Sequence, residues 1–254
     1  GSDLLLAETI IDTLNAKATI AAMEEVFEAR GYRLPVLISM TITDASGRTL
    51  SGQTLEAFVI SVSHAKPLAI GIYCALGPEE MRPYIEAMSK TTDSFVACYP
   101  NAGLPNEFGE YDLDAQSMAV QMGDFAQQGW LNIVGGRCGT TPTHIQAIYD
   151  AVSVLPPRPL PTLEPVTEYA GLEPLVIRED ANFMKVGERT NVSGSRKFAR
   201  LIREEQYEEA VAVALEQVQG GANILDVNMD EGMIDSEVAM QTFLRIIATE
   251  PDIA

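Results

Sequence analysis

Two cysteines follow apolar runs at positions where a thiol could act as a metal ligand. Cys138 lies in "IVGGRCGTTPTHI", after two glycines that end an apolar run, and Cys74 lies near the end of "PLAIGIYCAL". Thiolates are common zinc ligands, but a cysteine at a strand end is more often a small buried apolar residue. Arg137 stands directly before Cys138, where a second thiol would complete a metal-ligand pair. The spacing alone leaves both interpretations open.

Polar side chains end other apolar runs. Glu8 ends the first run, where its simplest role is that of a solvated or helix-capping carboxylate. Asp226 and Asn228 are two apart in "NILDVNMD", so on a strand they point to the same side and offer both hydrogen-bond donors and acceptors. Glu188 and Asn191 stand in the preceding segment "GERTN". The alternative role for Asp226 and Asn228 is to satisfy neighbouring backbone groups.

The elements that position these residues repeat about every 30 residues over the first part of the chain. Each repeat has a short apolar run, a turn and an amphipathic stretch, which is the length of a strand with its crossover helix. The pattern predicts an α/β fold of parallel (β/α) barrel units, whose active sites form at the carboxyl ends of the strands. The predicted strands are "DLLLAET", "PVLISMTIT", "PLAIGIYCAL", "SFVACYP" and "GWLNIVGG".

The alternation stops at a proline-rich segment and then restarts. We interpret residues 156–175 as a linker, because the stretch from Leu155 to Leu175 holds six of the 14 prolines. Residues 1–155 and 176–254 are then two domains. In the second, "NFMKVGERTN" and "NILDVNMD" are predicted strands, and "SGSRKFARLIREEQYEEAVAVALEQVQGGA" and "SEVAMQTFLRIIATE" are predicted helices. Neither domain has enough strands to close a barrel of eight, so we expect an internal segment of a longer polypeptide that spans parts of two barrels.

The composition excludes several classes of partner. A net charge of −19 argues against nucleic acid and against an anionic membrane surface, because both attract basic patches. No apolar run approaches the length of a membrane span, and the first residues lack the pattern of a signal peptide. Three cysteines do not form a disulfide framework, so we expect reduced thiols and a cytoplasmic location.

Eight separate motifs resemble the cobalamin-dependent methionine synthase family, the methyltetrahydrofolate:homocysteine methyltransferases, and they occur in that family's order. The resemblance implies that the first domain is the later part of a homocysteine-binding barrel and the second the opening of a pterin-binding barrel. It also implies that the cobalamin-binding and reactivation domains lie outside this chain. The motifs are "ETIIDTLNAKA", "TITDASGRTLSGQT", "CALGPEEMRPYI", "YPNAGLPNEFGEYD", "GTTPTHI", "GLEPL", "GERTNVSGSRKFARLI" and "LDVNMDEGM".

The resemblance also implies roles for single residues. Members of the family hold zinc with three cysteines, and the positions that match are Cys74, Cys138 and, in place of the third cysteine, Arg137. Glu8 matches the residue that accepts the ammonium group of homocysteine. The pocket for 5-methyltetrahydrofolate is expected to be lined by Glu188, Asn191, Asp226 and Asn228.

Three departures from the family pattern put the zinc site in doubt. Arginine stays protonated and offers no lone pair, and Tyr73 and Met40 are expected to add bulk at the same mouth. Either Cys98 replaces the missing ligand or zinc binds poorly. The sequence therefore predicts a methyltransferase segment, with a non-catalytic segment that has a disabled zinc site as the alternative.

Overall fold

The computed structural model describes residues 1–43 and 46–253, and Asp44 and Ala45 of the motif "TITDASGRTLSGQT" lie outside the described residues. The chain divides into two compact units, Gly1–Val176 and Ile177–Ala254. Each unit has a hydrophobic core of its own. As domain limits, 1–155, 156–175 and 176–254 stay a prediction.

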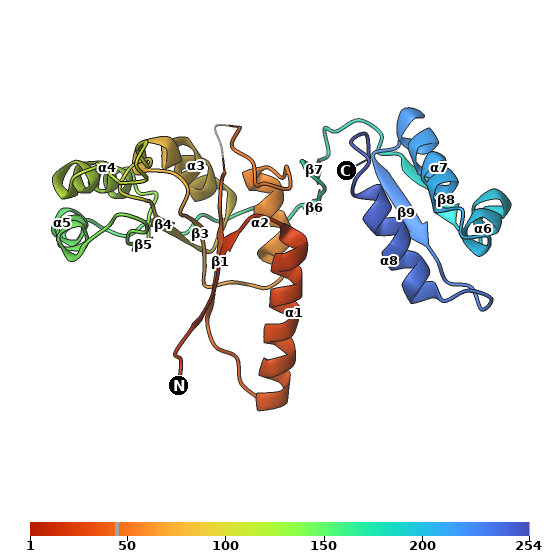
Figure 1. Cartoon of the computed structure of the whole chain (residues 1–254), viewed down its shortest axis with the longest axis horizontal. Helices are drawn as coiled ribbons and strands as arrows, with labels where there is room; N and C mark the ends of the chain where they lie inside the picture. Colours follow the sequence, from red (N-terminus) through yellow and green to blue (C-terminus); the bar gives the residue numbers. More distant parts are fainter. Residues whose placement is uncertain (44–45, 254) are drawn as a thin grey trace. The chain divides into compact units, whose positions relative to one another are not determined.

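The first unit contains a five-stranded sheet in the order β1-β2-β3-β4-β5 (Figure 1). Every neighbouring pair is parallel, which confirms the predicted α/β architecture of parallel strands. The five predicted runs are the five strands. Their bounds are β1 Leu5–Ile10, β2 Val36–Met40, β3 Ala69–Tyr73, β4 Phe95–Tyr99 and β5 Ile133–Val134.

Five helices of the described residues connect and follow these strands, and residues typical of helix ends mark their limits. The Asp12 side chain accepts a hydrogen bond from the Leu14 backbone N–H, and Gly31 ends that helix in the left-handed region at φ +71°. Pro78 occupies the first turn of the third helix. The bounds are α1 Thr13–Arg30, α2 Leu55–Ser63, α3 Pro78–Thr91, α4 Ala115–Gln127 and α5 Pro142–Val152.

The two faces of this sheet have different surroundings. Alternate strand residues such as Ile38, Ile70 and Cys98 pack with helix side chains in one large core. The other face carries a small cluster that includes Tyr73, whose ring stacks on Tyr99 with the centroids 4.2 Å apart. The residues that end the strands on this second face therefore point away from the large core, to the side that we call the inner face of the sheet.

The proline-rich segment belongs to the first unit and begins with a buried arginine. Arg158 is 4% exposed, and its guanidinium donates to the carbonyl oxygens of Ser89, Thr92 and Ser94 at 2.5–3.0 Å. Burial lowers the pKa of Arg158. Since the carbonyls lie at the end of α3 and before β4, this arginine ties the segment to the amino-terminal edge of the sheet.

The same segment ends in a two-stranded sheet formed by β6, Thr167–Ala170, and β7, Pro174–Ile177. It packs beside the start of α2, where the Thr54 N–H donates to the Leu172 carbonyl at 2.9 Å. The Gln53 amide donates to the Gly171 carbonyl, also at 2.9 Å. The motif "GLEPL" therefore lies against the loop that precedes α2.

The second unit pairs two parallel strands and packs three helices around one core. The strands are β8 Val186–Asn191 and β9 Ile224–Asn228, and the helices are α6 Arg196–Arg203, α7 Tyr207–Gln219 and α8 Ser236–Ile247. The prediction of one helix between the strands is wrong. The helix is interrupted between α6 and α7, where Glu205 adopts φ +55°. Phe198 and Phe243 meet edge to face at the centre of this core.

Within the described part of the chain, we find no helix with the length and apolar character that crossing a bilayer requires.

Candidate functional site

Glu8 lies on a β-bulge at the end of β1. The parallel register pairs Ala7 with Ile38 and then Ile10 with Met40, so Glu8 and Thr9 together oppose one residue, Ser39. Thr9 adopts φ +58° and its N–H donates to the Ser39 hydroxyl at 3.3 Å. Bulges bend a strand and re-aim its side chains, and they are frequent at barrel rims. The bulge therefore sets the direction of the Glu8 carboxylate.

Cys74 and Cys138 are brought together at the same strand ends. Their Sγ atoms lie 3.6 Å apart, although 64 positions separate them in the chain. Cys74 and Ala75 follow β3 with φ +65° and φ +64°, a conformation that costs about 1–3 kcal/mol for a residue with a side chain. The Ala102 N–H donates to the Cys138 carbonyl at 2.9 Å, which fixes the second cysteine to the loop after β4.

Arg137 pairs with Glu8 across this site. Its Nη2 atom lies 2.5 Å from Glu8 Oε2, and the two side chains are 33% and 34% exposed. The Arg137 N–H donates to the Pro100 carbonyl at 2.8 Å, and the Arg137 carbonyl accepts from the Thr140 N–H at 2.9 Å. The backbone of Arg137 is therefore fixed at both ends, and its guanidinium reaches the first strand.

The donor set falls one ligand short of a zinc site. Two thiolates that share a tetrahedral zinc, each about 2.3 Å from the metal, have sulfur atoms about 3.8 Å apart, so the 3.6 Å separation of Cys74 and Cys138 suits two ligands. No group of three or more His, Cys, Asp or Glu side chains within residues 1–43 and 46–253 is arranged to hold a metal ion. A guanidinium occupies the position beside Cys138, and it cannot coordinate a cation. These residues do not fit zinc as they stand.

Tyr111 is a site residue that sequence reasoning missed. Partial desolvation and then a hydrogen bond to Cys138 raise the pKa of its phenol, with a further effect from nearby Cys74. Its side chain packs over Gly139, where an added Cβ would lie 2.3 Å from the Tyr111 Cβ. Gly139 also adopts φ +79°. The glycine directly after Cys138, within "GTTPTHI", was the available sign that another side chain approaches there.

One expectation about the neighbours of the cysteines is wrong, and one of the two alternatives for the missing ligand is excluded. Met40 does not add bulk at the mouth, because its fully buried side chain packs in the core on the helix side of the sheet. Cys98 points to that side too, where its thiol contacts the Met81 sulfur at 3.9 Å and burial raises its pKa. It is therefore not a substitute ligand. Tyr73 does lie on the inner face, where burial and the adjacent Tyr99 raise its pKa.

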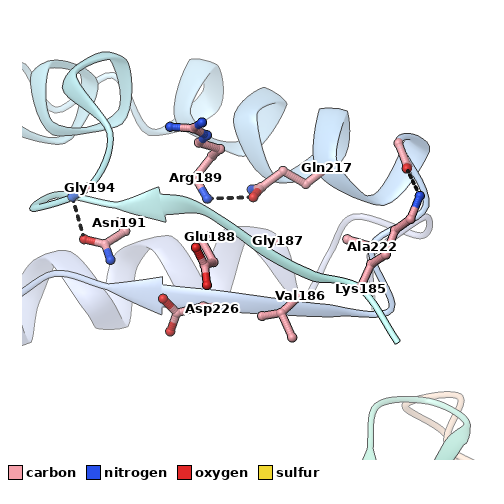
Figure 2. A pocket seen from close by; sticks show the side chains of 11 residues that line it. Lys185, Val186, Gly187, Glu188, Arg189, Asn191, Gly194, Gln217, Ala222 and Asp226 are labelled. Carbon is pink, nitrogen blue, oxygen red and sulfur yellow. Dashed lines mark hydrogen bonds between the residues drawn. The ribbon is translucent and has the colours of Figure 1, made fainter. Parts of the chain in front are cut away.

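The second unit has a pocket of about 670 Å³ along its two strands (Figure 2). Glu188 from β8 and Asp226 from β9 both line it, and so does Asn191 at the end of β8. The register shifts between Gly187 and Thr190, so β8 carries a bulge at Glu188, as β1 does at Glu8. The pocket therefore brings together three of the four residues expected around a pterin.

The two asparagines use their side-chain oxygens to shape the loops that follow the strands. Asn191 Oδ1 accepts from the N–H groups of Ser193 and Gly194 at 2.8 and 3.0 Å. Asn228 Oδ1 accepts from the Asp230 N–H at 2.7 Å. Both side chains thus satisfy neighbouring backbone groups, and these contacts leave the NH₂ end of each amide to face a ligand.

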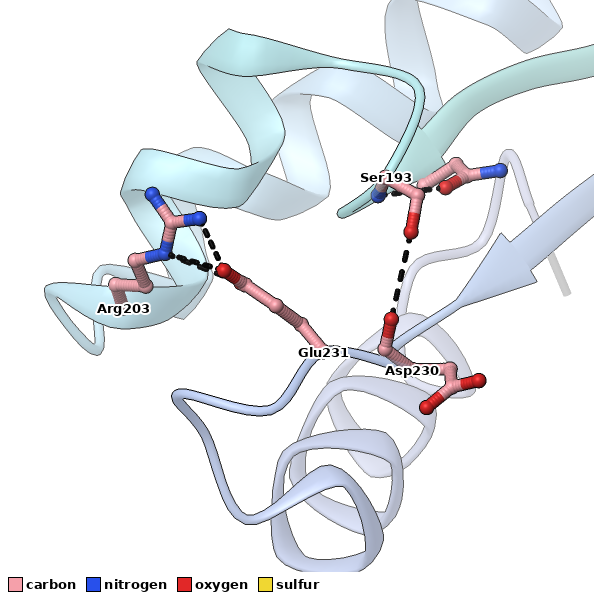
Figure 3. Close-up of polar contacts among 5 residues, drawn as sticks. Ser193, Arg203, Asp230 and Glu231 are labelled. Carbon is pink, nitrogen blue, oxygen red and sulfur yellow. Dashed lines mark hydrogen bonds and ion pairs between the residues drawn. The ribbon is translucent and has the colours of Figure 1, made fainter.

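The two loops are tied to each other and to α6 (Figure 3). The Ser193 hydroxyl donates to the Asp230 carbonyl at 3.4 Å. Arg203, at the end of α6, donates through Nε to both carboxylate oxygens of Glu231 at 3.1 and 3.0 Å. Their contact raises the pKa of Arg203. This rim is held in place before any ligand binds.

Two known protein families match this chain, one over the first unit and one over the second. A family model described as homocysteine S-methyltransferase matches residues 1–152, which is more than half of the chain. The chain belongs to the homocysteine S-methyltransferase family. A second model, described as pterin binding enzyme, matches residues 187–254 of the same chain. Both models describe domains of the TIM-barrel type, and the five-stranded sheet of the first unit is not closed into a barrel.

Solved structures of the homocysteine methyltransferase MmuM from Escherichia coli are similar to part of this family member. The apo form matches with 24% identity over 59% of this chain and 50% of that chain, at a TM-score of 0.44. The metallated form matches with 25% identity over 59% and 45% of the two chains, at a TM-score of 0.44. The chain thus spans about half the length of these structures.

Proposed function

We propose that this chain supplies the homocysteine and 5-methyltetrahydrofolate sites of a cobalamin-dependent methionine synthase. The whole protein would transfer a methyl group from 5-methyltetrahydrofolate to homocysteine and release methionine and tetrahydrofolate. The observation that carries the proposal is the succession of a homocysteine S-methyltransferase match and a pterin-binding match along one chain. A methyl acceptor in the first unit and a pterin-bearing methyl donor in the second would account for both matches.

In the second unit, the polar groups complement a pterin ring. The ring presents N–H donors along its 2-amino edge, and Asp226 and Glu188 offer carboxylates in one pocket. The amide NH₂ groups of Asn191 and Asn228 would donate to the acceptor atoms of the same ring plane. Since each asparagine shapes its own loop and the Ser193 hydroxyl links the two loops, little ordering is required when the ring binds.

In the first unit, Glu8 would accept the ammonium group of homocysteine, and the sulfur would lie beside Cys74 and Cys138. The transfer exchanges one bond for another: the methyl group leaves N5 of the folate, which takes a proton, and the homocysteine thiol loses its proton as the methyl–sulfur bond forms. Cobalamin, held by a domain outside this chain, would carry the methyl group between the two sites. The reactivation domain would likewise be a partner outside this chain, and with the acidic composition we propose a cytoplasmic location.

A non-catalytic role is the second candidate, and one observation favours it. The described residues provide two thiols and an Arg137–Glu8 ion pair where three thiols would hold zinc. In that case the first unit keeps its fold but does not activate homocysteine.

The proposal is tested by titrating the chain with 5-methyltetrahydrofolate and with its 2-desamino analogue in a calorimeter. We expect one site for the first ligand and at least about a tenfold loss of affinity for the second, which lacks hydrogen bonds to the carboxylates. Equal affinities, or no binding of either ligand, would reject the pterin site. A matched titration with L-homocysteine separates the two candidates, since the non-catalytic segment should not bind it.

A further inference from the structure

The ion pair between Arg137 and Glu8 links the two outer strands, β1 and β5, of the first unit's sheet. Arg137 follows β5, Glu8 lies in β1, and Nη2 and Oε2 are 2.5 Å apart. The same Oε2 atom also accepts from the Thr9 hydroxyl at 3.3 Å. One carboxylate oxygen at the candidate substrate site is therefore engaged by a cation that belongs to the chain.

A guanidinium and an α-ammonium group compete for a carboxylate in the same way. Both carry one positive charge and donate N–H hydrogen bonds, and arginine stays protonated throughout the working pH range. An amino acid that enters this site through its ammonium group therefore competes with Arg137 for Glu8 Oε2 and for the charge of the carboxylate.

We propose that Arg137 is a built-in competitor for the substrate's ammonium group and so controls which ligands the first unit accepts. The inference rests on the proposed homocysteine site and deepens it. While Glu8 is paired with Arg137, the ammonium group of an amino acid adds little to its binding affinity. A ligand without that group therefore binds with a similar affinity. Arg137 is thus a specificity-determining residue as well as the residue that replaces a metal ligand.

The geometry makes the competitor displaceable. The Arg137 backbone is fixed by hydrogen bonds to Pro100 and Thr140, so only the side chain has to move. Both partners of the ion pair are about one-third exposed, at 33% and 34%, and ion pairs in contact with solvent hold weakly. Release of Glu8 therefore requires a rotamer change and no movement of the sheet.

The test compares two probes, L-methionine and 4-(methylsulfanyl)butanoate, which has the same skeleton without the amino group. Calorimetric titration of the full chain should give affinities within about twofold of each other. In Arg137→Gln, which keeps a polar side chain without the charge, L-methionine should bind about fivefold more tightly than the deamino probe. Adding Glu8→Gln to that variant should remove the preference, and circular dichroism should show the same fold for all three proteins.

Each other outcome has a definite meaning. A strong preference for L-methionine in the unmodified chain that Arg137→Gln does not change would overturn the inference and leave the proposed function intact. Weaker binding of both probes in Arg137→Gln would also overturn it, since Arg137 would then bind the carboxylate of the ligand. If neither probe binds to any of the three proteins, the proposed homocysteine site itself is wrong, and the inference falls with it.

Discussion

Replacing Arg137 with cysteine should convert the first unit from a protein that holds almost no zinc to one that holds about one zinc ion per chain. Two of the required thiols already lie 3.6 Å apart, close to the separation that a shared zinc needs. The substitution supplies a third thiol beside them and removes a positive charge next to the metal position. One substitution thus restores the missing ligand and removes the charge repulsion.

The measurement is the zinc content after dialysis against a competing chelator, with X-ray absorption to find the metal–sulfur distance. Cys74→Ala on the Arg137→Cys background should abolish the gain. Arg137→Ser is the matched control, because it removes the charge without adding a thiol and should stay nearly free of zinc. If the unmodified chain already binds one zinc with sulfur at about 2.3 Å, our account of Arg137 is wrong.

Asp226→Asn should weaken the binding of 5-methyltetrahydrofolate by about 100-fold, since a carboxylate that accepts two N–H groups of the pterin loses its charge and gains a competing donor. Asp226 is an exposed residue in the middle of β9 and lines the pocket, so the change should leave the core of the second unit intact. Calorimetry measures the affinity, and thermal unfolding checks the fold.

Asp180→Asn is the matched control for this substitution. Asp180 is an exposed aspartate of the same unit that does not line the pocket, so its variant should bind the folate as the unmodified chain does. The same affinity in Asp226→Asn and in the unmodified chain would remove Asp226 from the site.

Much of the fold follows from residue pattern alone, because apolar runs buried on two faces have few alternatives to parallel strands. The recurrence of those runs also explains why Glu8, Cys74 and Cys138 could be expected at one edge of the sheet before any contact was known. Alternation along a strand would have placed Cys98 on the helix side, since it lies between Ala97 and Tyr99 of the other face. It would have placed Met40 there as well, since Met40 lies two positions after Ile38 of the large core. The error at Met40 came from considering where the strand ends without considering which face of the sheet the side chain occupies.

Other features depend on local geometry that the pattern does not encode. The bulges at Glu8 and Glu188 shift the register by one residue, and a simple repeat of two does not show such a shift. The Arg137–Glu8 pair depends on the first of these bulges together with a turn far along the chain. The proline content of the segment after α5 predicted a linker. It did not predict that Arg158 is buried against three carbonyl groups.

The central claim is that each unit binds its own substrate at the carboxyl ends of its strands, and amide hydrogen exchange tests it most directly. The full chain would be measured alone, with 5-methyltetrahydrofolate and with L-homocysteine. We predict that the folate slows exchange at residues 187–194 and 226–231, and that homocysteine slows it at residues 8–10, 74–76 and 137–140. Protection of the first unit by the folate, or no protection by the folate anywhere in the chain, would contradict the account, whereas a lack of protection by homocysteine alone would identify the first unit as the non-catalytic candidate.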